Sequence, residues 1–329
     1  MFGKLWGRGG RERPEADPYA LPVPRRQKDG TYTLRALGDA RVLALTDAVR
    51  TDDWAAFTTA LAPFDLGRDH HVLSELAELG GVQNWIVEAA EGKEEYRATA
   101  LLVAGARNIA WGWEARTRAS AKNVTREQWR LFHERLEAAE EQLLEAAELR
   151  PEWTTPWSRL LTSGRGMSLG DTVNETRLAA ALRRDPLDLA AHLEWVSYLQ
   201  PRWSGEPGQA LAFARESFTR APQGHRLGCV IACAHIEDWV ESDDGKCLET
   251  PGIQAELRAA AEHSILHPGY VRVPGWQHDF SLFAMALSLA GERGTARRAF
   301  GALDGAFTGR PWSYLSQPEK QFARYRSRG

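Results

Sequence analysis

Ala147-Glu148-Leu149-Arg150-Pro151 closes an alanine-rich amphipathic stretch, and the same kind of ending recurs three times further along the chain. The other endings are Leu182-Arg183-Arg184-Asp185-Pro186, Phe218-Thr219-Arg220-Ala221-Pro222 and Ser264-Ile265-Leu266-His267-Pro268. The prolines stand 35, 36 and 46 residues apart, and a polar insert from Glu241 to Gly252 explains the longer interval. Because proline cannot continue a helix, a period near 35 residues predicts stacked helical hairpins. The predicted hairpins span residues 152–184, 187–220, 223–266 and 276–305.

Helical periodicity also fills the chain before Pro151, and no segment alternates convincingly with period two. Apolar residues recur at three- and four-residue steps over 37–49, 51–61, 71–79, 82–90 and 94–119. Thr125 and Gln128 then form a capping-box pattern, followed by a helix whose buried face begins at Trp129 and Phe132. We therefore predict an all-α fold, an α-solenoid of antiparallel helical hairpins with about 12 to 14 helices.

Composition divides the chain into four parts. Residues 1–30 are basic and rich in Pro and Gly, so we expect a disordered leader. Residues 31–122 form an N-terminal helical region, residues 123–309 the hairpins, and residues 310–329 a basic C-terminal tail or capping helix. The 329 residues are enough for one elongated solenoid or for two domains.

The hairpins resemble tetratricopeptide repeats over residues 126–305. In the last hairpin Phe280, Phe283, Ala284 and Leu287 are followed by a second set, Ala296, Phe300 and Leu303, at the spacings of that family. Trp157 and Leu160 match it after Pro151, whereas His192 and Gly228 stand where the family places an aromatic residue. The resemblance implies helices that pack closely through small residues, and it implies nothing about the ligand.

Two segments are also similar to an uncharacterised bacterial domain family. The first is Leu199-Gln-Pro-Arg-Trp-Ser-Gly-Glu-Pro207, followed by Ala210-Leu-Ala-Phe-Ala214, and the second is Ile109-Ala-Trp-Gly-Trp-Glu-Ala-Arg116. Ser204-Gly205-Glu206 departs from the glycine-glycine-serine pattern of that family. This resemblance implies a fold but no chemistry.

Charge and targeting signals restrict the partners and the compartment. A net charge of -3 provides no overall cationic field for nucleic acid, and no basic stripe or recognition helix is visible. The N-terminus lacks an apolar run for a signal peptide, and no stretch is long enough to span a membrane. Three cysteines without a signal peptide favour a reducing cytoplasm.

No motif in the sequence predicts a catalytic residue, a metal or a cofactor. Cys229 and Cys233 have the spacing of two metal ligands on one helix face, as do His263 and His267, but two ligands do not make a site. Packing explains the cysteines, and the negative end of a helix explains the histidines. An enzyme whose acids and histidines converge between the hairpins stays open as the alternative, and it predicts a deep pocket with shifted pKa values.

Thirteen tryptophans and a few arginines supply the candidate binding residues. These candidates come from two groups. One group holds aromatic and basic residues in segments that do not follow the repeat pattern, and the other holds residues that the pattern places on the concave face formed by the first helices. The predicted protein- or peptide-binding residues are Trp111, Trp113, Arg116, Arg165, Gln200, Arg202, Trp203, Arg226 and His278. Ser158, Thr162, Ser197, Cys229 and Ser281 are expected on the same concave face. We expect a non-catalytic scaffold whose partner is an unidentified protein or peptide, in an oligomeric state that the sequence does not indicate.

Overall fold

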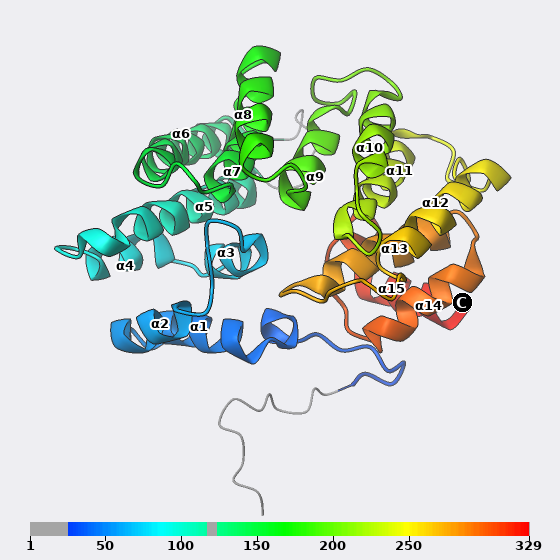
Figure 1. The fold of residues 1–329 in the computed structure, drawn as a ribbon, viewed down its shortest axis with the longest axis horizontal. Coiled ribbons are helices and arrows are strands. Elements are labelled where there is room, and N and C mark those ends of the chain that lie inside the picture. Colours follow the sequence, from blue (N-terminus) through cyan, green and yellow to red (C-terminus); the bar gives the residue numbers. More distant parts are fainter. Residues whose placement is uncertain (1–25, 117–123, 329) are drawn as a thin grey trace, which may run out of the picture.

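A computed structural model describes residues 26–116 and 124–328, and these residues form an all-α fold without a β-sheet (Figure 1). The all-α part of the predicted fold class is therefore confirmed. Fifteen α-helices occur in the described ranges, one more than the upper end of the predicted number. Most of the predicted leader, residues 1–25, lies outside the described residues, as do residues 117–123 and 329.

The helices before Pro151 pack around one apolar cluster. They are α1 (Ala40–Arg50), α2 (Trp54–Leu61), α3 (His70–Ala77), α4 (Val82–Ala89), α5 (Arg97–Arg116) and α6 (Arg126–Leu149). The two longest, α5 and α6, form a close antiparallel pair. Thr125 and Gln128 form the predicted capping box at the start of α6. Local sequence signals thus start this helix where its apolar face begins.

Each predicted hairpin contains two helices, and the first three hairpins end before Pro186, Pro222 and Pro268. The pairs are α7 (Thr155–Gly166) with α8 (Asp171–Arg184), α9 (Leu189–Tyr198) with α10 (Gln209–Thr219), α11 (Cys229–Glu241) with α12 (Pro251–His263), and α13 (Trp276–Leu289) with α14 (Arg293–Leu303). The first helices contact one another in sequence order, α7 with α9, α9 with α11 and α11 with α13. The last helix, α15 (Pro318–Arg328), packs on α13 and α14.

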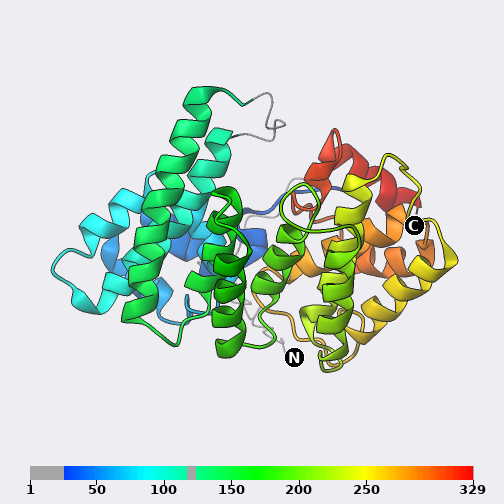
Figure 2. The ribbon, with the colours of Figure 1, turned by 90° about the horizontal axis from the view of Figure 1, so that it is seen from above.

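Helix α7 joins the two halves of the molecule. Leu160 is buried in the N-terminal apolar cluster, whereas its neighbour Leu161 is buried in the cluster formed by the later helices. In Figure 2 the green segment that contains α7 to α9 lies between the blue-to-teal and the yellow-to-red helices. Side chains of α7 therefore face both apolar clusters, and residues from the two halves of the molecule can meet at this helix.

The two ends of the described chain meet. Arg26 forms an ion pair with Asp304 at 2.6 Å, and Tyr32 forms a parallel bridge with Ala306. Figure 1 shows the blue segment before α1 reaching across to the orange and red helices. Residues 26–30 were expected to be disordered, but the structure places them against the C-terminal helices: Gln27 Nε2 donates to Glu319 at 3.0 Å, and the Arg326 side chain donates to the Asp29 carbonyl at 3.3 Å. Trp312, in the expected tail, is fully buried.

No helix among the described residues has the length and apolar character needed to cross a bilayer.

Candidate functional site

Four of the predicted binding residues meet on one side of α7. We call Trp113, Arg116, Arg165 and Trp203, together with Trp129, the aromatic–arginine cluster. The rings of Trp113 and Trp203 are 5.8 Å apart and nearly perpendicular. The Arg165 guanidinium lies 4.9 Å from the centre of the Trp203 ring and 5.2 Å from that of Trp113. Arg116 lies 5.3 to 5.7 Å from all three rings, so each cation faces more than one aromatic surface.

Small residues make this convergence possible. Gly166 ends α7, and a Cβ at this position would come within 2.7 Å of Leu136 and 3.3 Å of Trp113. Gly205 lets the loop that carries Trp203 fold back, because a Cβ there would lie 1.9 Å from the Leu199 carbonyl oxygen. The cluster therefore draws on α5, α6, α7 and the loop between α9 and α10, which are far apart in sequence.

The cluster combines partial exposure with incomplete polar contacts. Its five side chains are all partly exposed. Arg165 pairs with Glu194 at 3.1 Å, but its Nε is buried without an acceptor, and the buried Trp113 Nε1 also has no partner among the described residues. Burial lowers the pKa of Arg116, and the nearby positive charge of Arg165 lowers it further. The cluster thus offers aromatic surface and positive charge to an acidic or carbonyl-bearing group.

Trp111 and Arg202 do not join this cluster. The Trp111 ring stacks on Arg135, whose guanidinium lies 3.6 Å from the ring centre. Arg202 is close to the cluster in sequence, but it forms ion pairs with Glu237 and Glu241 of α11. These two predicted binding residues therefore contribute to packing between helices.

Three more of the predicted binding residues make contacts inside the protein: Gln200, Arg226 and His278. Gln200 is completely buried, which contradicts its prediction as an exposed groove residue. Arg226 forms a bidentate ion pair with the buried Asp279, in which Nε donates to Oδ2 at 2.9 Å and Nη2 donates to Oδ1 at 2.7 Å. The His278 ring lies 5.8 Å from that of His71 on α3, at the junction between the two halves.

The predicted concave face is closed over α11 and α13. Ser158, Thr162, Cys229 and Ser281 are all buried. Thr308 Oγ1 and the Trp312 indole both donate hydrogen bonds to Ser281 Oγ, at 2.8 and 2.9 Å. Tyr314 donates to Glu237 on α11 at 2.6 Å. The segment from Thr308 to Tyr314 thus covers part of α11 and α13. The repeat pattern in the sequence does not reveal this covering.

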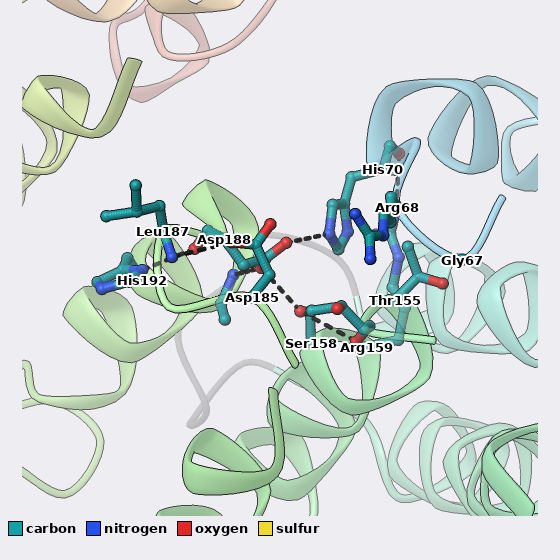
Figure 3. Close-up of polar contacts among 12 residues, drawn as sticks. Gly67, Arg68, His70, Thr155, Ser158, Arg159, Asp185, Leu187, Asp188 and His192 are labelled. Carbon is teal, nitrogen blue, oxygen red and sulfur yellow. Dashed lines mark hydrogen bonds and ion pairs between the residues drawn. The ribbon is translucent and has the colours of Figure 1, made fainter. Parts of the chain in front are cut away.

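A polar network centred on Asp188 connects α3, α7 and α9 (Figure 3). The Asp188 carboxylate lies 2.6 Å from His70 Nε2 and accepts hydrogen bonds from Ser158 Oγ at 3.0 Å and the Ala191 amide at 2.6 Å. Burial alone would raise the pKa of Asp188, but the charge of His70 and these hydrogen bonds outweigh it and lower the pKa to about 2. The network holds three segments together at one ionised carboxylate.

The same residue types do not form a catalytic relay. Ser158 donates to Asp188 and not to His70, so the histidine is not placed to take its proton. Burial raises the pKa of the Cys229 and Cys233 thiols, which keeps them protonated and unreactive. In residues 26–116 and 124–328 no group of three or more His, Cys, Asp or Glu side chains could hold a metal ion.

Two surface cavities accompany these features. One of about 370 Å³ lies between the corner that contains Pro201 and the end of α11. Another of about 300 Å³ is lined by Glu75, His278, the backbone near Leu37 and the segment Phe307 to Gly309. Burial raises the pKa of Glu75 and lowers that of His278, so both groups shift toward their neutral forms.

Arg159 and the Asp188 network are not among the residues predicted from the sequence. Arg159 is one residue from the predicted groove residue Ser158, yet it faces α3. Nothing local in the sequence indicates that His70 and Asp188, which are 118 positions apart, form a contact.

No family model, curated protein or solved structure matches this chain.

Proposed function

We propose that this chain is a non-catalytic module that binds a protein or peptide, built as a tetratricopeptide-like α-solenoid. The successive contacts between α7, α9, α11 and α13 support the repeat architecture. The three cysteines are free, which supports a reducing compartment such as the cytoplasm. The observation that carries the proposal is the aromatic–arginine cluster.

Tryptophan and arginine are the residue types that contribute most to binding energy at protein interfaces. Here three partly exposed tryptophans and two arginines gather from four separate segments. Arg116 and Arg165 repel each other, and a carboxylate between them would relieve that repulsion. We therefore expect a partner segment that brings an acidic side chain next to an apolar one.

A random peptide library displayed on phage tests this function. Peptides selected by the wild-type protein are synthesised, and their Kd values are measured by fluorescence polarisation against Trp203→Ala. We expect about tenfold weaker binding, because the variant removes the ring on which both guanidinium groups stack.

Trp276→Ala is the matched control. Trp276 is also partly exposed and also carries an arginine, Arg272, 3.9 Å from its ring centre, but it lies on α13 outside the cluster. Its peptide affinities should stay within about twofold of wild type. Failure to select any peptide family, or equal losses in both variants, would contradict the proposal.

A catalytic function is the second candidate, favoured by one observation. The cavity of about 300 Å³ contains Glu75 and His278, whose pKa values shift in opposite directions as an acid–base pair requires. Its lining residues include no serine, cysteine or lysine that could act as a nucleophile. An activity abolished by both Glu75→Gln and His278→Gln, and retained in Trp203→Ala, would place this candidate first.

A further inference from the structure

Arg159 lies in the middle of α7 and faces α3, and its guanidinium has no acidic partner in the part of the chain that the structure describes. Its Nη2 donates hydrogen bonds to Ser74 Oγ at 2.6 Å and to the His70 carbonyl at 3.2 Å. Its Nε is buried without an acceptor, and no carboxylate oxygen in the described residues lies within 4.0 Å of the guanidinium. Withdrawing an arginine from water without a counter-ion costs folding free energy. A binding site can carry such a cost, because a bound ligand then supplies the acceptor that the protein lacks.

Two of the acids around Arg159 are occupied by other cations. Asp188 binds His70 at 2.6 Å, and Glu194 binds Arg165 at 3.1 Å. Burial lowers the pKa of Arg159, and the positive charge of Arg310 adds to this effect, whereas Glu194, Asp188 and Glu78 oppose it from a distance. A second cation therefore lies close enough to strengthen the positive potential at Arg159.

Two further polar atoms beside Arg159 have no hydrogen-bond partner within residues 26–116 and 124–328. His70, whose carbonyl accepts from Arg159, has a buried Nδ1 without a hydrogen bond. Thr162 lies three residues after Arg159 on α7, so the two side chains are neighbours on the helix surface. Its Oγ1 is buried and unpaired, although the residue is 8% exposed. Arg159 and Thr162 can both donate to one acceptor-rich ligand.

We propose that Arg159, with Thr162 and His70 beside it, forms a binding site for a small oxyanion of the phosphate type. The Arg159 Nε–H is free to donate to an oxygen of such an anion, and the positive charge of the guanidinium attracts the anion. Free phosphate and a phosphoryl group carried by a partner share this chemistry. No residue of the aromatic–arginine cluster is part of the site, so it goes beyond the proposed function and does not depend on it.

Calorimetry and NMR on the full chain test the site. Inorganic phosphate and N-acetyl-phosphoserine amide are titrated separately at constant ionic strength, with chloride as the balancing anion. We expect saturable binding of at least one phosphate compound and a shift of the Arg159 Nε–H resonance. The ratio of the two affinities distinguishes the free anion from the carried phosphoryl group.

Three variants locate the binding. Arg159→Met should weaken it about tenfold, and Thr162→Val, which keeps the side-chain shape and removes only the hydroxyl, about threefold. Arg184→Met is the matched control, because Arg184 on α8 also has a pKa lowered by burial and stacks on Trp157. It should change the affinity less than twofold.

The outcomes separate the two proposals. If no phosphate compound binds beyond the chloride control, or if Arg184→Met weakens binding as much as Arg159→Met, the oxyanion site is wrong. Trp203→Ala should leave phosphate binding unchanged. Loss of peptide binding in Trp203→Ala without any phosphate binding would refute the oxyanion site and leave the proposed function in place.

Discussion

The carboxylate of Asp188 holds three segments at one point, because it caps α9 while it contacts His70 of α3 and Ser158 of α7. Only 5% of this residue is exposed. Its pKa falls from 3.8 to about 2 on folding, so the ionised form is favoured in the folded state. A group with a lowered folded pKa contributes stability above its unfolded pKa, and this contribution is lost as the pH falls from about 4 toward 2.

We predict that Asp188→Asn lowers the free energy of unfolding by about 2 kcal/mol at pH 7 and by much less at pH 2. Urea denaturation at the two pH values measures the difference. Asp53→Asn is the control, because Asp53 caps α2 through the Ala56 amide but is exposed and has no histidine partner. Asparagine caps a helix as well as aspartate, so Asp53→Asn should have little effect at either pH. Equal effects of the two variants would show that the His70 contact contributes nothing.

Among the helices, α5 and α6 form a tight pair in which glycines set the distance. A Cβ on Gly105 would lie 2.7 Å from Leu143, whereas one on Gly112 would have no neighbour closer than 3.4 Å. Both glycines are buried within α5. The same substitution at the two positions therefore separates helix propensity from packing.

We predict opposite effects of alanine at these two positions. Gly112→Ala should stabilise the protein by about 0.5 kcal/mol, because alanine favours the helix and meets only ordinary contacts. Gly105→Ala should destabilise it by about 1 kcal/mol, because Leu143 must move away from the new methyl group. Urea denaturation of both variants measures this. A stabilising Gly105→Ala would mean that α5 and α6 are further apart than described.

Sequence periodicity predicted these elements well because helix formation is local. The capping box at Thr125 and the hairpin ends at the prolines required only neighbouring residues. The convergence of Trp113 with Trp203 was not predictable in the same way, because it depends on how four helical segments pack. Gln200 was misplaced for the same reason: the repeat pattern gave its helix face but not the neighbours that bury it. The sequence thus predicted a set of residue types, and four of the nine predicted residues lie together in the structure.

In the whole molecule, the segment before α1 connects the two apolar clusters. Ala36 in this segment belongs to the N-terminal cluster, while the Tyr32 amide donates to the Gly305 carbonyl at 3.0 Å and the Tyr32 carbonyl accepts from the Phe307 amide at 2.8 Å. Gly305 has a φ of +92°, and a Cβ there would lie 2.4 Å from the Gly30 carbonyl oxygen. Closure of the chain ends therefore depends on a backbone contact that only glycine permits.

Gly305→Ala should break this closure without touching either apolar cluster. We predict that the variant loses about 2 kcal/mol of unfolding free energy, because the new methyl group meets a rigid carbonyl and the backbone conformation disfavours alanine. Hydrogen exchange at the Tyr32 and Phe307 amides should accelerate in the same variant, because both amides lose their protection when the segment detaches. Gly301→Ala is the control four residues earlier: a Cβ on Gly301, in α14, meets nothing within 4 Å, so that variant should be as stable as wild type or slightly more so. Unchanged exchange at Tyr32 in Gly305→Ala would show that the two chain ends are held together by other contacts, such as the ion pair between Arg26 and Asp304.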